Sequence, residues 1–239
     1  MKNALNRFYE FLDRPLYGWS RIALAALVVP LVLAFSQPLW RISMTAPQYP
    51  KGLYIDIFPH TIESGHDNHD LVEINTLNHY IGMHKIDRAE LSDLDWIPFA
   101  LVALALLTLR CAVIGNVRML VDLSVTAGFI GAFSMGRFVY KLYSMGHNLD
   151  PTAPIHLEGF TPAIFGKKQI ANFATESWPQ SGAIWVGVFI TGVVGITAWH
   201  LIWGRISAAR ADRAAAALTV APEPSRPVVT VEQPPAPPA

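Results

Sequence analysis

Apolar residues gather into four long runs separated by polar stretches, and this pattern carries the fold prediction. The runs cover residues 22–40, 96–117, 119–140 and 183–203. About 20 mostly apolar residues in a helix suffice to cross the hydrocarbon core of a bilayer. We therefore predict an all-α membrane protein with four transmembrane helices, the first of them kinked at Pro30.

Basic residues predict the orientation of these helices. Arg and Lys concentrate in residues 1–21, beside the tight turn between the second and third helices, and in residues 204–239. Such residues remain on the cytoplasmic side, so both termini are predicted to be cytoplasmic. The predicted inner parts hold ten basic and five acidic residues, the outer parts hold eight basic and twelve acidic residues, and Asp122 lies within the third span. The formal net charge of zero therefore conceals a basic inner side and an acidic outer side, as in a bacterial inner-membrane protein.

The segments outside the four runs have distinct characters. Residues 1–21 are predicted to form a cytoplasmic amphipathic segment, and residues 204–239 a cytoplasmic tail rich in Ala and Pro. Residues 41–95 and 141–182 form two long periplasmic loops. Leu53, Ile55 and Ile57 alternate with Tyr54, Asp56 and Phe58, which indicates a strand. We expect the two loops to build a small periplasmic cap.

The outer loops are the candidate location of a metal site, because seven of the eight histidines lie there. His66 and His69 are bracketed by aspartates, whereas His79 and Met83 would share one face of a helix. Imidazole with thioether suits Cu(I), and imidazole with carboxylate accommodates Zn(II), Cu(II) or Ni(II). The candidate metal ligands are His66, His69, His79, Met83, His84 and His147, and Met44 and Met145 would add thioethers if the loops fold close together. The alternative is that these histidines are ordinary solvated side chains.

Other cofactor chemistry has little support. The chain has one cysteine, Cys111, and no CxxCH motif, and His200 is the one histidine within a predicted span. No haem is therefore predicted. No recognised catalytic motif is present, so the chain is not expected to be an enzyme. Basic residues do not outnumber acidic residues in the chain, which argues against nucleic acid as a partner.

Two charged residues in the third span need an explanation. Asp122 lies four residues after Arg118, so an ion pair along the helix is expected, with a proton or ion relay as the alternative. Arg137, at the outer end of the span, is expected to anchor the helix or to face an anionic quinone or a lipid headgroup. Two stripes of small residues are predicted to lie in the bundle interior, with contacts to a partner subunit as the alternative. They are Gly128, Ala132 and Gly136, and Gly187, Thr191 and Gly195.

Three stretches of the outer loops also carry a family resemblance. They read QYPKGLYIDI, EINTLNHYIGMHKID and GHNLDPTAPIHLEGFTPAIFGKKQIANF. They resemble small polytopic membrane proteins encoded near copper-chaperone lipoproteins and nitrous oxide reductase in bacterial respiratory gene clusters, over roughly residues 20–205. The resemblance implies an accessory role in copper-dependent respiration, with a periplasmic copper protein or respiratory-complex subunits as partners. The alternative is a structural or quinone-interacting subunit of a respiratory complex, without a metal of its own.

Overall fold

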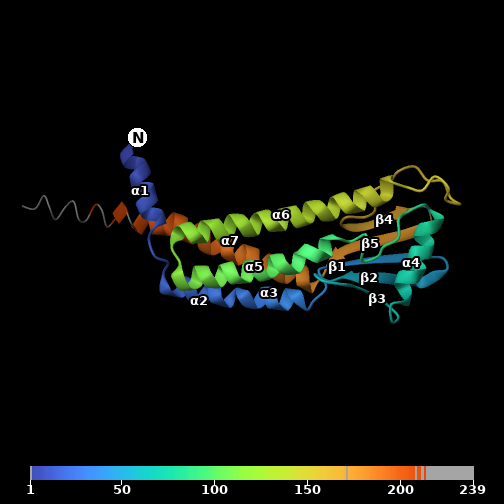
Figure 1. Cartoon of the computed structure of the whole chain (residues 1–239), viewed down its shortest axis with the longest axis horizontal. Helices are drawn as coiled ribbons and strands as arrows, with labels where there is room; N and C mark the ends of the chain where they lie inside the picture. Colours follow the sequence, from blue (N-terminus) through green and yellow to red (C-terminus); the bar gives the residue numbers. More distant parts are fainter. Residues whose placement is uncertain (1, 171, 208, 211–212, 214–239) are drawn as a thin grey trace, which may run out of the picture.

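The computed structural model describes residues 2–170, 172–207, 209–210 and 213, and it has two parts. A bundle of long helices occupies one part, and a small domain built around a sheet caps one end of the bundle (Figure 1). Most of the predicted tail from residue 204 onward lies outside the described residues.

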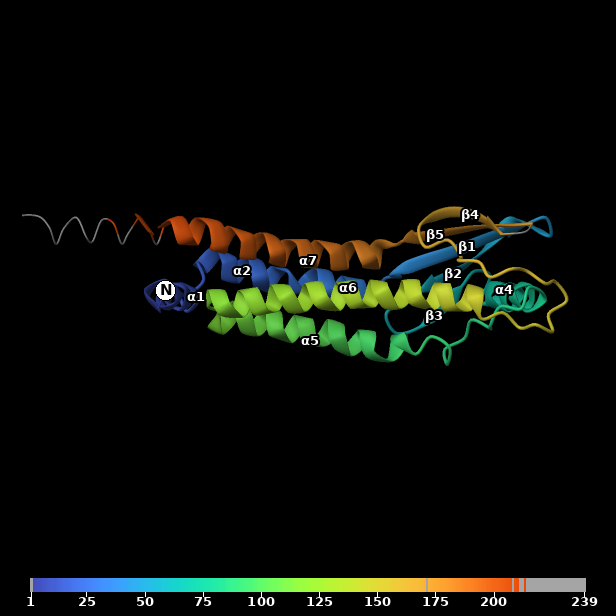
Figure 2. The ribbon, with the colours of Figure 1, turned by 90° about the horizontal axis from the view of Figure 1, so that it is seen from above.

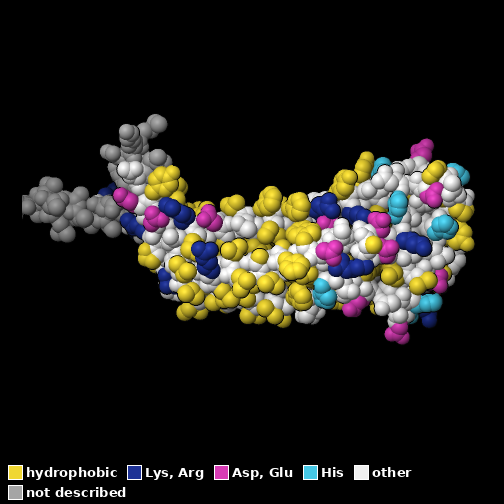
Figure 3. All heavy atoms as spheres, viewed as in Figure 1, with side chains coloured by type: hydrophobic (Ala, Val, Ile, Leu, Met, Phe, Trp, Pro, Cys, Tyr) yellow, Lys and Arg dark blue, Asp and Glu magenta, His cyan; other side chains and the backbone are white. Residues whose placement is uncertain are grey.

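Four helical segments of the described chain are long and apolar enough to cross a membrane, namely Gly18–Phe35, Asp93–Ile114, Val117–His147 and Ser181–Ser207. The prediction of four transmembrane helices is thus confirmed, and the chain is a multi-pass membrane protein. Apolar side chains cover the bundle, while charged side chains gather at its two ends (Figure 3).

The first span is two helices, α2 (Gly18–Ala26) and α3 (Val28–Phe35), that meet at Leu27. The break therefore precedes the expected kink at Pro30. A proline has no N–H to bond the carbonyl four residues earlier, and its ring presses on that carbonyl. For Pro30 this carbonyl belongs to Ala26, the last residue of α2.

The second span, α5 (Asp93–Ile114), contains Pro98 near its start. Pro98 leaves the carbonyl of Leu94 without its helical donor. The guanidinium of Arg88 donates to this carbonyl at 3.4 Å, so the helix continues without a break.

The third span belongs to α6 (Val117–His147), which is longer than predicted. Its 31 residues extend about 46 Å at 1.5 Å per residue, against a hydrocarbon core of about 30 Å. The last turns of α6 therefore project beyond the membrane and lie over the sheet domain (Figure 1).

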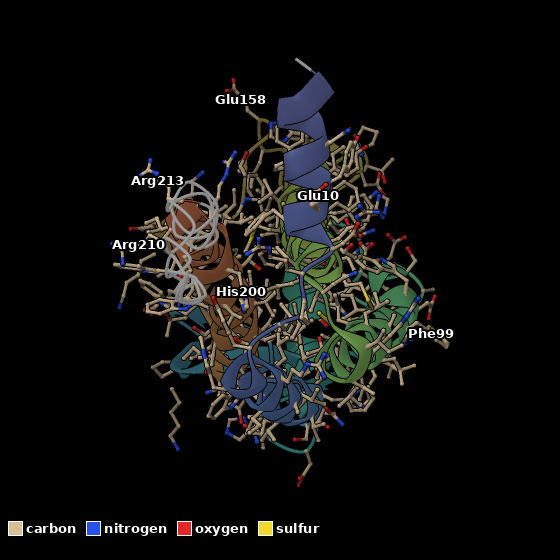
Figure 4. The ribbon with its side chains drawn as sticks, turned by 90° about the vertical axis from the view of Figure 1, so that its left-hand side faces the viewer. Glu10, Phe99, Glu158, His200, Arg210 and Arg213 are labelled. Carbon is tan, nitrogen blue, oxygen red and sulfur yellow. The ribbon has the colours of Figure 1, made fainter. Side chains whose placement is uncertain are left out.

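The fourth span is α7 (Ser181–Trp199), followed by a π-helical turn, η1 (His200–Gly204). His200 is buried, and its Nε2 lies 2.9 Å from the hydroxyl of Ser20 in α2. Seen from the end that carries α1 (Lys2–Leu12), His200 lies among the helices while Phe99 points outward (Figure 4). His200 thus joins η1 to the first span through this hydrogen bond.

Both stripes of small residues face away from the bundle, contrary to the prediction. A Cβ added at Gly128, Gly136, Gly187 or Gly195 would meet no atom within 4 Å. The bundle interior is formed instead by larger side chains, among them Leu24, Leu104, Leu120 and Phe189.

The cap is a five-stranded sheet, so the prediction of an all-α fold is wrong for this part. The strands are β1 (Trp40–Ala46), β2 (Tyr49–Ile57), β3 (Ile62–Ser64), β4 (Gly166–Ile170) and β5 (Phe173–Pro179). Their order is β3-β2-β1-β5-β4, and each neighbouring pair is antiparallel. The strand expected around Leu53–Ile57 is confirmed as part of β2. Because β1 and β5 come from different loops, the two loops meet in one sheet.

One helix, α4 (His69–Tyr80), packs against this sheet through Ile74 and Leu77, which contact Leu53 and Ile55 of β2. The loop after α6 runs beside α4 and returns to β4 (Figure 2). We call the five strands, α4 and their connecting loops the sheet domain.

Candidate metal-binding cavity

A cavity of about 60 Å³ lies inside the sheet domain, where the sheet, α4 and the end of α6 meet. Three methionines from separate parts of the chain line it: Met44 of β1, Met83 after α4, and Met145 of α6. We call it the methionine cavity. Its other lining residues are Ile42, Ile55, Ile74, Asn78, Ile81, Ile86, Leu142, Phe160, Pro162, Ala163, Ile170, Phe173, Thr175 and Glu176.

Met83 reaches the cavity because α4 ends just before it. Gly82 adopts a φ of +78°, which side-chain-bearing residues rarely adopt, and the chain reverses there. The N–H of Met83 then donates to the carbonyl of Asn78 at 2.9 Å. The side-chain amide of Asn75 fixes the following segment through two hydrogen bonds to the backbone of Ile86, at 2.7 and 3.0 Å.

Met145 lies where the loop after α6 folds back on the helix. The N–H of Phe160 donates to the carbonyl of Gly146 at 2.9 Å. A Cβ at residue 146 would overlap the carbonyl oxygen of Phe160, so only glycine permits this approach. The loop thereby closes one wall of the cavity with Phe160, Pro162 and Ala163.

The chain reversal at Gly82 separates the expected pair of His79 and Met83. His79 is an exposed residue in the last turn of α4, while Met83 follows the helix end and lines the cavity. The prediction that they share one helical face is therefore wrong. His84 is also exposed. Hydrogen bonds from Thr152 hold the pKa of Asp150 below its usual value, with a smaller contribution from His79 and His84.

The other candidate histidines lie apart, each with its own partner. The Nδ1 of His66 donates to Asp70 at 2.7 Å, and His69 Nε2 lies 3.5 Å from Glu73. His147 stacks on Tyr143, and its Nδ1 donates to the carbonyl of that residue at 2.9 Å. Histidines are spread over the sheet domain (Figure 3). Within the described residues, no three His, Cys, Asp or Glu side chains form a group that could hold a metal ion.

Asp122 does not pair with Arg118 as expected. Arg118 contacts Asp13 instead, at 3.1 Å, and its guanidinium lies 5.8 Å from the ring centre of Tyr9. The segment before the first span docks here, and the N–H of Val117 donates to the carbonyl of Arg14. Asp122 is exposed and has no ion-pair partner among the described residues.

Arg137 joins α6 to the start of α5 through an ion pair. Its guanidinium contacts both carboxylate oxygens of Asp93, at 3.0 and 3.3 Å. One turn later, Lys141 contacts Glu90 at 2.8 Å. The Lys141 ammonium holds the pKa of Glu90 below its usual value.

We expect the Arg137–Asp93 pair to contribute measurably to stability. In a double-mutant cycle of Arg137→Ala and Asp93→Ala, the coupling free energy should be about 1 kcal/mol, near the upper end for partly exposed pairs. The geometry is bidentate, and the Asp93 side chain is only 19% exposed. Reversible unfolding in detergent micelles measures this coupling.

Arg88 and Asp95 provide the matched control, because they form an ion pair at 2.7 Å with side chains 48% and 72% exposed. Their coupling should stay below about 0.5 kcal/mol. Equal coupling in the two pairs would contradict a special role for Arg137.

A second cavity of about 100 Å³ lies next to the first, at the level where α5 and α6 meet the sheet domain. The two cavities share four lining residues, which are Ile42, Ile86, Leu142 and Met145. Trp96, Phe138 and Lys141 also line the second cavity. Its walls are thus formed largely by the two membrane helices.

The structure therefore places three methionines, and none of the histidines, in the wall of one cavity. Of the predicted metal ligands, Met83 lines the methionine cavity. Met44 and Met145, which were expected to add thioethers if the loops fold close together, line it as well. Asn78 also lines the cavity and was not predicted, because a single asparagine in a helix has no distinguishing pattern. Comparison of the chain with protein-family models, with curated proteins and with solved structures finds no match.

Proposed function

We propose that this protein is an accessory protein of the bacterial inner membrane that binds Cu(I) at its outer face, in support of copper-dependent respiration. One observation carries the proposal: methionines from three separate segments line a single cavity in the sheet domain. Thioether sulfur is a soft ligand that selects Cu(I) over harder divalent ions. The protein is proposed to hold copper and not to catalyse a reaction.

The distribution of charge supports the orientation that this function needs. Arg14, Arg21, Arg110 and Arg118 all belong to the end of the bundle opposite the sheet domain. By the positive-inside rule that end faces the cytoplasm. The sheet domain and its methionine cavity then face the periplasm, where a copper protein can dock.

The sequence resemblance supports the copper assignment independently. The three stretches that carry the resemblance converge on the methionine cavity and supply Ile55 from the first, Asn78 and Met83 from the second, and Phe160 from the third. An accessory role beside a periplasmic copper protein, as the resemblance implies, needs a site that holds copper near the membrane.

Titration of the purified protein with Cu(I) under anaerobic conditions, against a chromophoric chelator, tests the proposal. The wild type should bind one equivalent. Replacing Met44, Met83 and Met145 together with leucine should weaken binding by at least about 100-fold, or roughly 2.8 kcal/mol. Leucine preserves the apolar volume, so the sheet domain should remain folded.

Two control variants isolate the cavity. Met119→Leu with Met135→Leu removes two thioethers of α6 that do not line the cavity, and should leave the affinity unchanged. His79→Ala with His84→Ala removes exposed imidazoles beside Met83 and should change the affinity less than threefold, within about 0.7 kcal/mol. A wild type that binds no Cu(I), or a triple leucine variant that binds as tightly as the wild type, would overturn the proposal.

The second cavity favours one alternative, a quinone-interacting subunit of a respiratory complex. This cavity is apolar, opens between two membrane helices and carries Trp96 and Phe138 on its walls. A protein that binds no Cu(I) but retains one equivalent of quinone through purification would favour that function.

A further inference from the structure

An unpaired hydrogen-bond donor lies in the wall of the methionine cavity. Asn78 is 2% exposed, and its side-chain nitrogen Nδ2 has no hydrogen-bond partner among the described residues. Leaving a buried polar group unpaired costs about 1–3 kcal/mol, and buried polar groups are almost always paired. The donor therefore indicates that the cavity accommodates a ligand with a hydrogen-bond acceptor.

The metal alone does not provide this acceptor. A Cu(I) ion bound by three thioethers retains its positive charge, because all three ligands are neutral, and a fourth coordination position remains open. Burying an uncompensated charge in an apolar cavity is unfavourable. Glu176 is the one charged residue among the described residues that line the cavity, and its carboxylate is already paired with Lys167 at 2.6 Å.

We propose that the cavity takes Cu(I) together with a small anion of the halide class, chloride in the periplasm, and that Asn78 donates a hydrogen bond to this anion. The inference rests on the copper-binding function proposed above and specifies the form in which copper is held. The anion completes the coordination of the ion, neutralises its charge and pairs the amide of Asn78.

The size of the cavity agrees with this occupancy. A single water needs roughly 10–15 Å³ of such space, whereas the cavity provides about 60 Å³. An ion and one small ligand therefore fit, but a bulky organic anion does not.

The test compares Cu(I) affinity in chloride and in nitrate buffers at equal ionic strength, for the wild type and for Asn78→Leu. In chloride the wild type should bind Cu(I) at least tenfold more tightly than Asn78→Leu does. In nitrate the two proteins should bind alike. Chloride also complexes free Cu(I), so each variant is compared with the wild type in the same buffer.

X-ray absorption at the copper edge, with bromide in place of chloride, identifies the fourth ligand directly. The wild type should show bromine beside sulfur in the copper shell, and Asn78→Leu should show sulfur without bromine. Asn78→Asp keeps the side-chain volume and brings its own negative charge. Once the complexation of free Cu(I) by halide is corrected for, it should therefore bind Cu(I) with an affinity that does not depend on halide, which keeps the test valid if Asn78→Leu does not fold.

Thr76→Leu is the matched control, because Thr76 is an exposed residue of the same helix and its substitution should keep the halide dependence. Cu(I) binding by the wild type with no halide dependence and no bromine signal would overturn this inference and leave the proposed function intact. Absence of Cu(I) binding in both buffers would overturn the proposed function, and the inference with it.

Discussion

Replacing Trp40 with alanine should detach the sheet domain from the membrane helices and destabilise the protein by about 3–5 kcal/mol, as for other buried aromatic residues. Trp40 is 7% exposed and begins β1, a few residues after the first span ends at Phe35. Its indole Nε1 donates to the hydroxyl of Ser177 in β5 at 2.7 Å. Its ring packs against Phe138 of α6 and Phe165, with centroids 4.9 and 5.0 Å away. One side chain thus joins both loops and a membrane helix.

Thermal unfolding followed by near-ultraviolet circular dichroism, together with limited proteolysis of the sheet domain, measures the effect. Trp178→Ala is the matched control, because Trp178 lies in the same sheet but is 48% exposed. It should cost less than about 1 kcal/mol. Trp40→Phe removes the hydrogen bond and retains most of the packing, so it should cost about 1–2 kcal/mol. A Trp40→Ala protein as stable as Trp178→Ala would show that this residue does not hold the domain in place.

The role of Trp40 illustrates which parts of the fold the sequence could predict. The four spans could be predicted because the length of an apolar run is a local property, read directly along the chain. The apolar pattern placed Trp40 at the end of the first predicted span, residues 22–40. The span in fact ends at Phe35. The buried position of Trp40 depends on β5, which lies more than a hundred residues further along the chain.

The sheet as a whole was not predicted, because it also depends on segments that lie far apart in the chain. The pattern in Leu53, Ile55 and Ile57 identifies one strand, but no local pattern shows that β1 pairs with β5 across two membrane helices. The sequence of α4 also gave little indication of a helix that packs on a sheet, because its apolar and polar residues do not separate onto two faces. Pairing between distant segments is decided by tertiary packing, which a single sequence does not display.

The candidate site, like the fold, could be predicted only in part from the sequence. The thioether type of the ligands was recognisable from residue chemistry, and Met83 was among the predicted ligands. The prediction that His79 and Met83 share one helical face was wrong, because the helix ends between them and the chain reverses at Gly82, which has a positive φ. Asn78 became noticeable only through its burial and its unpaired nitrogen, which are properties of the folded protein.

Charge pairs show the limit of spacing rules most directly. Arg118 and Asp122 stand four residues apart on α6, yet Arg118 contacts Asp13 from the segment before the first span. An exposed i, i+4 pair gains only about 0.3–0.5 kcal/mol, so a competing partner from another segment easily displaces it. Arg137 likewise pairs with Asp93 at the start of α5, and Lys141 pairs with Glu90, which precedes α5.

Gly146 is the position at which a single methyl group should open the methionine cavity. A Cβ at this residue would overlap the carbonyl oxygen of Phe160, whose N–H donates to Gly146. In Gly146→Ala the loop after α6 must move away from the helix, which breaks this hydrogen bond and displaces Phe160 and Pro162 from the cavity wall.

We expect Gly146→Ala to destabilise the sheet domain by about 2–3 kcal/mol, since overpacking a close contact costs about this much, and to weaken Cu(I) binding at least tenfold. Gly136→Ala provides the control on the same helix, because a Cβ there meets no atom within 4 Å. Alanine should stabilise that position by about 0.5–1 kcal/mol through its higher helix propensity. Hydrogen exchange at the amide of Phe160, combined with Cu(I) titration, separates the two variants, with faster exchange and weaker binding expected in Gly146→Ala alone. Slow exchange at Phe160 with wild-type Cu(I) affinity in Gly146→Ala would show that the loop does not need to contact α6 to close the cavity.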